Sequence, residues 1–321
     1  MLFIYNKDTQ LNLIEYGIEI PLLGKRGALV FEFIKENFKE DLIIQKELEN
    51  CSKENLLLAH SIKFVDRLFV DPEKDLLTAF ELIAADGSFH RYNPNLATNT
   101  LNNLVQRILK QVSGTILTCV QALQGGFAFH LGGGLHHAMA NTGRGFCLVN
   151  DLVIAARFLQ KEYDLDNILI IDVDAHKGDG TAQITKNDDS ITTLSIHMKD
   201  NWPMDTNNKS DPCFIPSDID IAVGRDDNYL KELKLGLEKL KDFQKPDLCI
   251  VVQGSDPYEY DELESSNQIN LSLNQMLERD KLVYKYLKGK MIPQAYVMAG
   301  GYGKRAHEPY IEFLKFIKTT F

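Results

Sequence analysis

The chain has 321 residues, 44% of them hydrophobic and 25% charged, and its 35 basic and 45 acidic residues give a net charge of −10. This composition excludes a disordered chain, a collagen-like fibre and a small disulfide scaffold. The negative charge argues against a general binder of the nucleic-acid backbone, and the length suits one large α/β domain, which we expect over residues 1–321.

In chain order, the first hundred residues give few signals beyond helical patterns at 27–38 and 53–70. From residue 100 onward, nearly continuous apolar runs alternate with helical patterns, as in a parallel sheet covered on both faces. The runs expected to be strands are 127–131, 168–173, 191–196, 248–252 and 295–298. The later helical patterns lie at 102–123, 148–163, 230–240, 275–287 and 306–317. We therefore expect an α/β fold with right-handed crossovers.

The five cysteines form no CxxC pair, which indicates a reducing compartment without a zinc knuckle. The N-terminus becomes charged at Lys7, too early for a signal peptide, and no apolar run approaches the roughly 20 residues of a membrane span. We expect a cytoplasmic protein that neither crosses a membrane nor binds nucleic acid directly.

Polar clusters follow all five expected strands at their carboxyl ends. In order, they are Gly132-Gly-Gly-Leu-His136-His137, Asp172-Val-Asp174-Ala-His176-Lys-Gly-Asp179, Ser195-Ile-His197, Gly254-Ser-Asp256 and Gly300-Gly-Tyr302-Gly303. Ligands of open parallel sheets bind at this edge. Five clusters at one edge predict a functional site.

The second cluster has the spacing of a metal site. Asp172, Asp174 and His176 are two residues apart, which places their side chains on one face of an extended chain. Carboxylates and an imidazole suit a divalent metal such as zinc, and Asp256 offers a further ligand from another strand end. Such a site leaves a position open for water and substrate.

The tandem histidines follow three glycines, which allow the backbone to approach a ligand closely. Beside a metal, His136 and His137 suit a general base and an electrostatic partner, with Asp172 and Asp179 as the carboxylates that fix their tautomers. Tyr302, between two glycines, has the freedom to donate its hydroxyl to a developing oxyanion, although a turn tyrosine is the simpler interpretation of that residue alone.

Other reaction classes have less support. Cys147 before a helical pattern is a weak candidate nucleophile, because free cysteines are commonly buried and inert. The sequence contains no GxSxG elbow, no GxxxxGK[ST] loop and no GxGxxG motif after a strand.

Taken together, the motifs GGG-L-HH, GFC-LVND, IDVDAHKGDG, LSIH, GSD and AGGY resemble the zinc-dependent histone deacetylase family. The likeness runs from about Asn102 to the C-terminus, and HSIKFVDRL near His60 also shares it. The motifs DVDAH, Glu278-Arg-Asp-Lys-Leu-Val-Tyr and Gly300-Gly-Tyr-Gly-Lys-Arg look most like class IV, the histone deacetylase 11 type.

This resemblance implies an arginase/deacetylase fold with a mainly parallel eight-stranded sheet, and hydrolysis of an acyl-lysine amide. It implies one zinc ion on Asp174, His176 and Asp256, with His137 as general base and acid and His136 as electrostatic partner. The remaining implied roles are orientation of the histidine pair by Asp172 and Asp179, polarisation of the carbonyl by Tyr302, walls of the substrate tunnel at Gly145 and Phe146, and K⁺ at Asp172, Asp174, His176, Ser195 and Ile196.

The resemblance leaves the substrate open. The segment 201–205 departs from the proline and Gly-Thr-Gly-like loop of many deacetylases, and Trp202 there is either a tunnel wall or a loop anchor. The acyl group is acetyl or a longer fatty chain. The alternatives are an acetylpolyamine or other small-molecule amidohydrolase, an arginase-like hydrolase, disfavoured because Asp256 has no second DxD pair, and a non-catalytic scaffold.

Overall fold

Every strand pairing of the computed structural model is parallel, within an eight-stranded sheet of order β2-β1-β3-β8-β7-β4-β5-β6. The structure describes residues 1–22, 24–44 and 47–320. The strands are β1 (Leu2–Ile4), β2 (Ile43–Ile44), β3 (Phe127–His130), β4 (Ile168–Asp172), β5 (Ile191–Met198), β6 (Ile219–Val223), β7 (Leu248–Val252) and β8 (Gln294–Val297). The expected parallel α/β sheet is confirmed.

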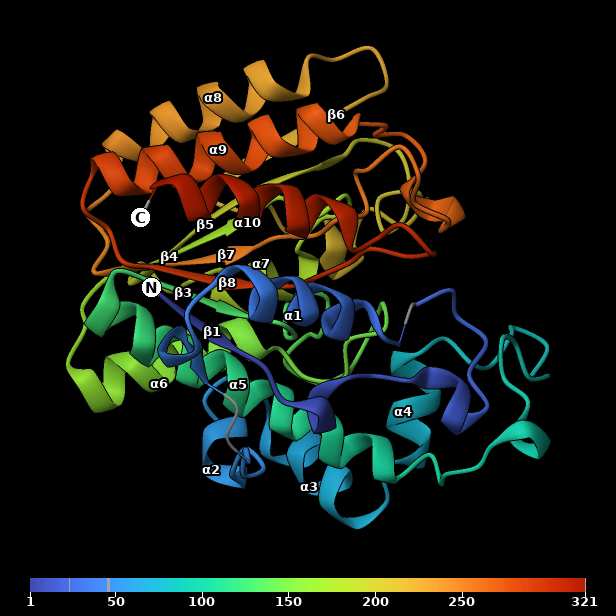
Figure 1. Ribbon diagram of the computed structural model, residues 1–321. Helices are drawn as coiled ribbons and strands as arrows, with labels where there is room; N and C mark the ends of the chain where they lie inside the picture. The colour runs from blue at the N-terminus through green and yellow to red at the C-terminus, as the bar shows by residue number, and fades with distance from the viewer. Residues whose placement is uncertain (23, 45–46, 321) are drawn as a thin grey trace.

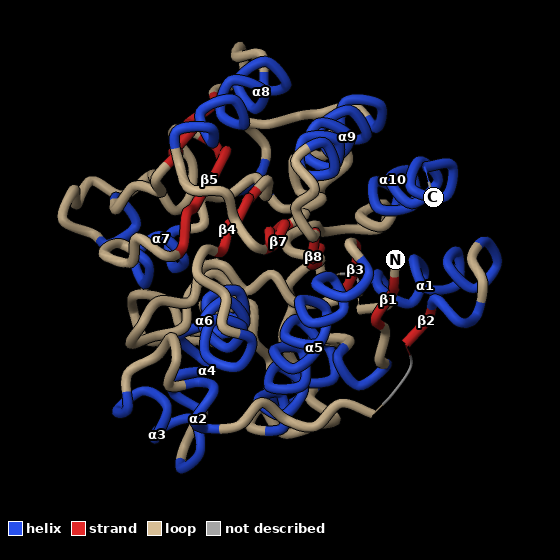
Figure 2. Tube along the Cα trace, turned by 90° about the vertical axis from the view of Figure 1, so that its left-hand side faces the viewer, coloured by secondary structure: helices blue, strands red, loops and turns tan. Residues whose placement is uncertain are grey.

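Helices cover both faces of this sheet (Figure 1). The α-helices are α1 (Arg26–Asn37), α2 (Lys53–Leu56), α3 (Ile62–Val70), α4 (Glu73–Ala79), α5 (Asn103–Gly125), α6 (Asp151–Tyr163), α7 (Asp179–Thr185), α8 (Tyr229–Lys239), α9 (Leu273–Gly289) and α10 (Glu308–Thr320). Viewed almost along the strands, α1, α8, α9 and α10 lie on one side of the sheet and α2 to α6 on the other (Figure 2). Among the described residues, no helix is long and apolar enough to cross a membrane.

The strands are apolar on both sides because two cores meet at the sheet. In β4, Ile168 and Ile170 belong to the core under α5 and α6, whereas Leu169 and Ile171 belong to the core under α8, α9 and α10. Side chains alternate along a strand, so a strand buried on both faces must be apolar at every position. This arrangement places the polar residues after β4 and β7 at the carboxyl edge of the sheet.

The sequence patterns located the elements that they predicted to within a few residues, with one error, but they missed β1, β2, β6, α4 and α7. The expected helix 53–70 is two helices, α2 and α3, with a break at 57–61. His60 causes the break, because its Nδ1 lies 3.1 Å from the Met139 carbonyl oxygen and its Nε2 accepts the Asn150 N–H at 2.9 Å. These tertiary bonds override the local helical pattern. The single domain over residues 1–321 stays a prediction.

Candidate active site

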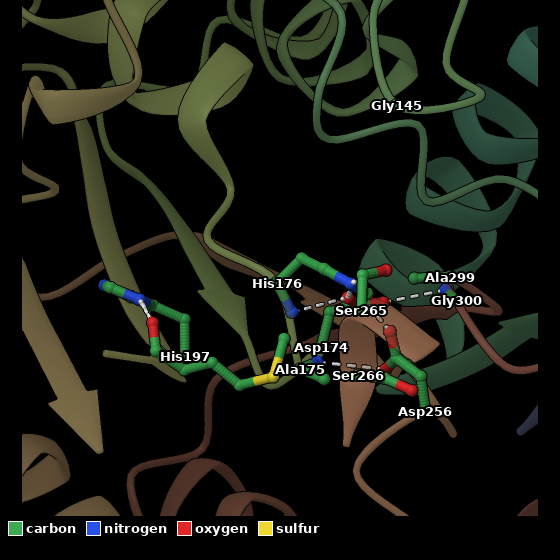
Figure 3. Close-up of polar contacts among 12 residues, drawn as sticks. Gly145, Asp174, Ala175, His176, His197, Asp256, Ser265, Ser266, Ala299 and Gly300 are labelled. Carbon is green, nitrogen blue, oxygen red and sulfur yellow. Dashed lines mark hydrogen bonds and ion pairs between the residues drawn. The ribbon is translucent and has the colours of Figure 1, made fainter. Parts of the chain in front are cut away.

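Three buried side chains from two strand ends form the candidate metal centre. Asp174 and His176 follow β4 and Asp256 follows β7. His176 Nδ1 lies 2.9 Å from Asp256 Oδ2 and 3.2 Å from Asp174 Oδ1, and one potential ligand atom from each residue falls within 4.8 Å of the others. Figure 3 shows the three side chains pointing toward one another. The three residues that the sequence analysis proposed as metal ligands therefore lie together in the fold.

Glycines allow the backbone to enclose this centre. A Cβ atom added at Gly254 would lie 2.2 Å from Asp174 Oδ2, and one added at Gly300 would lie 2.5 Å from Asp256 Oδ2. Gly300 N–H donates to Asp174 Oδ2 at 2.7 Å, and Ala175 N–H donates to Asp256 Oδ1 at 2.9 Å. A further backbone N–H donates to Asp174 Oδ1 at 3.0 Å, so the backbone fixes both oxygens of Asp174 and one oxygen of Asp256.

The donor set suits a divalent cation. Burial opposes a charged His176, but the hydrogen bonds to Asp174 and Asp256 outweigh burial and raise the His176 pKa to about 10. Burial also raises the Asp256 pKa to about 7, and the charge of Asp174 acts in the same direction. Two buried carboxylates that stabilise a nearby positive charge form a site that suits a divalent metal ion.

The tandem histidines each meet one carboxylate. His136 Nδ1 lies 2.6 Å from Asp172 Oδ2, and His137 Nδ1 lies 2.7 Å from Asp179 Oδ1. All four side chains are buried, and the centres of the two imidazole rings are 3.9 Å apart. A carboxylate at Nδ1 fixes the ring orientation and leaves Nε2 for chemistry.

Their surroundings drive the two histidine pKa values apart. Burial opposes a charged His136, but the carboxylates of Asp172 and Asp174 outweigh it and raise the His136 pKa to about 9. Burial lowers the His137 pKa to about 4, and the charge of His136 lowers it further against the effect of Asp179. Near neutral pH the pair therefore contains one cation, His136, and one neutral imidazole, His137.

Tyr302 is held over the same centre by its backbone. Its N–H donates to Asp261 Oδ2 at 2.7 Å, and the flanking Gly301 and Gly303 have φ of 132° and 87°. Tyr302 is 8% exposed, and its ring meets that of Phe146 edge-on, with ring centres 6.0 Å apart. Burial raises the pKa of the Tyr302 hydroxyl well above its usual value, so this hydroxyl remains a hydrogen-bond donor.

The expected tunnel residues line one wall beside the histidines. The Trp202 ring meets the His137 ring edge-on, with centres 4.6 Å apart. Gly145 has φ of 54°, and a Cβ atom there would lie 2.4 Å from the Trp202 ring. Phe146 N–H donates to the Ala79 carbonyl oxygen at 2.8 Å, which ties the wall to the end of α4.

Two cavities meet at these residues. An inner cavity of about 100 Å³ reaches apolar side chains that include Leu13, Ile20 and Phe80. An outer hollow of about 540 Å³ opens past Trp202. Residues that line both are His137, Gly145, Phe146, His176 and Tyr302. The candidate reacting groups thus lie where an outer opening meets an internal space.

The residues expected to bind potassium lie beside the metal centre. Asp172 and Ser195 are neighbours across β4 and β5, and Ser195 Oγ accepts the Gly178 N–H at 3.4 Å. Ile196 is buried in the next position of β5. In the same region the buried Lys177 ammonium pairs with Asp220. Potassium at these residues stays a prediction.

Several supporting residues were missed by the sequence reasoning. Asp151 accepts the N–H groups of Gly134 and Leu135 at 3.0 and 2.6 Å and so fixes the loop before the histidine pair. Arg144 Nη1 lies 3.3 Å from Asp179 Oδ2. Asp151 stood in the quoted motif LVND, whereas nothing around Arg144 or Asp261 distinguishes them from other charged residues in the sequence.

Comparisons with known proteins agree with this arrangement. The family model described as "Histone deacetylase domain" matches residues 21–313. An uncharacterized protein of Picosynechococcus is 38% identical over 205 residues, which is 64% of this chain and 66% of that protein. Histone deacetylase 2 of Arabidopsis thaliana is 28% identical over 305 residues, 94% of this chain and 74% of the relative. In fold, the chain is similar to the acetylpolyamine aminohydrolase of Burkholderia pseudomallei, with a TM-score of 0.70, 16% identity and 98% of each chain covered. The chain belongs to the histone deacetylase domain family.

Proposed function

We propose that this protein is a zinc-dependent deacylase that hydrolyses the amide of an N-acylated lysine in a protein or peptide. The observation that carries the proposal is the pair of buried His–Asp contacts, His136 with Asp172 and His137 with Asp179, next to three candidate metal-ligand side chains where the two cavities meet. A neutral base and a cation fixed beside a metal centre are the groups that amide hydrolysis needs. The class IV subgroup and the cytoplasmic location stay predictions from the sequence.

Asp174, His176 and Asp256 would hold the zinc ion, which as a Lewis acid polarises a carbonyl group and lowers the pKa of water. The proposed potassium ion, at Asp172, Asp174, His176, Ser195 and Ile196, would have a structural role. The family membership of the chain supports both assignments.

In this mechanism the histidines move the proton. Neutral His137 accepts a proton at Nε2 from the attacking water, while Asp179 holds the proton at Nδ1. The positive charge of His136, fixed by Asp172, stabilises the negative charge that develops at the carbonyl. The proton then passes to the amide nitrogen as the C–N bond breaks, which gives a carboxylate and a free lysine amine.

Tyr302 and the tunnel wall position the substrate. The Tyr302 hydroxyl donates a hydrogen bond to the carbonyl oxygen as its negative charge grows. Gly145, Phe146 and Trp202 line the path of the lysine side chain and exclude water from it. The inner cavity would receive the acyl group, and the apolar part of its lining, which includes Leu13, Ile20 and Phe80, suits acetyl or a longer chain.

A release assay tests the proposal. Lysine peptides with acetyl, octanoyl or myristoyl groups would be given to the wild type and to His137→Ala, with and without a chelator. We expect the wild type to release the acyl group and the chelator to abolish this release. We expect His137→Ala still to bind zinc but to turn over about 10²- to 10⁴-fold more slowly. Full activity in the presence of the chelator would contradict the metal assignment.

A small acylated polyamine is the second candidate substrate, because the outer hollow is acidic. Its lining includes the acidic residues Glu81, Asp205 and Glu264, against the cations Arg91 and His176. Carboxylates around an opening favour a substrate that carries further ammonium groups. For a polyamine deacetylase, we expect kcat/KM to be higher for an acetylated polyamine than for a neutral acetyl-lysine amide. Glu81→Gln should reduce the ratio of these two kcat/KM values about threefold. An equal reduction of this ratio by Glu238→Gln, at the end of α8, would argue against the polyamine substrate.

A further inference from the structure

A buried arginine links the two segments that carry the metal ligands. Arg279 lies on α9, and its side chain is fully buried. Its Nη1 donates to the carbonyl oxygen of Val173 at 3.0 Å and to that of Gly254 at 2.7 Å. One nitrogen therefore holds the carboxyl ends of β4 and β7 together.

Both carbonyl groups are close in sequence to metal ligands. Val173 directly precedes Asp174, and Gly254 stands two residues before Asp256. The two segments are also in close contact, because a Cβ atom on Gly254 would lie 2.7 Å from the Asp174 Cα atom. A shift of either carbonyl group would therefore change the separation of Asp174 from Asp256.

Asp280 completes the arrangement by balancing the buried charge. Arg279 Nε donates to Asp280 Oδ1 at 2.8 Å, and Arg279 Nη2 lies 2.8 Å from the same oxygen. Asp280 Oδ2 accepts the Gln253 side-chain N–H at 2.7 Å, and Gln253 belongs to the same end of β7. A planar, forked donor can meet a carboxylate and two carbonyl groups at once, whereas the single ammonium group of lysine cannot hold the same geometry.

We propose that Arg279, oriented by Asp280, is a positioning residue that sets the geometry of Asp174, His176 and Asp256 and thereby the metal affinity of the protein. The inference rests on the proposed function, since it requires this triad to bind a divalent cation. It also gives a role to the motif Glu278-Arg-Asp-Lys-Leu, which the catalytic mechanism does not use. Partners that orient metal ligands change metal affinity about 10- to 100-fold when they are replaced.

The test measures metal binding without turnover. Arg279→Lys keeps the positive charge but loses the fork, and Zn²⁺ and Co²⁺ affinities would be measured by competition with a chromogenic chelator. The absorption bands of bound Co²⁺ would report the ligand geometry. Arg157→Lys is the matched control, because Arg157 also joins a carbonyl group, that of Leu58, to a carboxylate, Asp188, on the other side of the sheet.

We expect Arg279→Lys to weaken metal affinity at least tenfold and to shift the Co²⁺ bands, while Arg157→Lys leaves both unchanged. Wild-type affinity and an unchanged spectrum in folded Arg279→Lys would overturn the inference and leave the proposed function intact. Failure of the wild type to bind one zinc ion would instead overturn the proposed function, and the inference with it. If Arg279→Lys does not fold, the charge-neutral pair Arg279→Gln with Asp280→Asn replaces it and must show the same loss.

Discussion

At the scale of single residues, the candidate site depends on positions where no side chain fits. Gly145 combines a left-handed backbone with contacts on two sides, because its missing Cβ atom would lie 2.4 Å from Trp202 and 2.6 Å from His137. His137 cannot yield freely, since its Nδ1 lies 2.7 Å from Asp179 Oδ1. The glycine thus lets an aromatic wall lie directly on the candidate base.

A methyl group at this position should therefore disturb activity more than metal binding. We expect Gly145→Ala to lower kcat/KM by about 10²-fold, because displacing a reacting group by about 1 Å has an effect of that size. Zinc affinity should stay at the wild-type level, since Gly145 does not adjoin Asp174 or Asp256. Gly289→Ala is the control, because an added Cβ atom there has open space. Unchanged kinetics of Gly145→Ala would show that this wall does not position His137.

At the scale of elements, the helical sequence pattern around His60 and its tertiary contacts favour different structures. The sequence from 53 to 70 has helical spacing throughout, so it predicts one helix. The actual break places the His60 imidazole between the Met139 carbonyl oxygen and the Asn150 N–H. No local rule contains this information, because both partners lie about 80 to 90 residues away. The strands β1 and β2 escaped prediction because they are only three and two residues long, and β6 because it is a half-exposed edge strand interrupted by Asp220.

The same contact predicts a pH dependence of stability. Nδ1–H donates and Nε2 accepts, so the folded state requires neutral His60, and burial lowers the His60 pKa from 6.5 to about 4. The unfolded chain binds more protons between these values, so stability is full above pH 6.5 and falls as the pH drops toward 4, by on the order of 3 kcal/mol from this group.

Denaturant unfolding at pH 7 and pH 5 would measure this effect. His60→Asn should be less stable at pH 7, where it loses one hydrogen bond, but should lose less stability on acidification than the wild type does. His90→Asn, at an exposed position, should behave like the wild type. A parallel loss of stability in His60→Asn and wild type would contradict the assignment.

At the scale of the whole molecule, the sheet collects reactive side chains from distant parts of the chain at one edge. The sequence could predict this collection, because continuous apolar runs identify buried parallel strands and their carboxyl ends share one edge. It could not predict the supporting contacts of Asp151, Arg144 or Arg279, which depend on how helices approach that edge. The candidate metal ligands were therefore readable from the sequence as residues that the fold brings together, whereas the contacts of Arg279 beside them were not.

Gathering acidic groups in a buried edge also has a consequence for stability. Asp172, Asp174, Asp179 and Asp256 are each at most 4% exposed. Buried like charges destabilise a fold unless a cation balances them, so a bound metal should add stability as well as chemistry. For wild type at a free zinc concentration 1,000 times its Kd, linkage gives about 4 kcal/mol.

Asp256→Asn should separate these two effects. It removes one buried charge, so we expect the metal-free variant to be at least as stable as the metal-free wild type, with little further gain when zinc is added. Thermal unfolding of both proteins, with chelator and with zinc, would measure this, and Asp242→Asn at an exposed position is the control. A zinc-dependent rise in Tm that is equal in Asp256→Asn and wild type would mean that the ion binds elsewhere. A large loss of stability in Asp256→Asn with chelator present would mean that Asp256 stabilises the fold even without a metal ion.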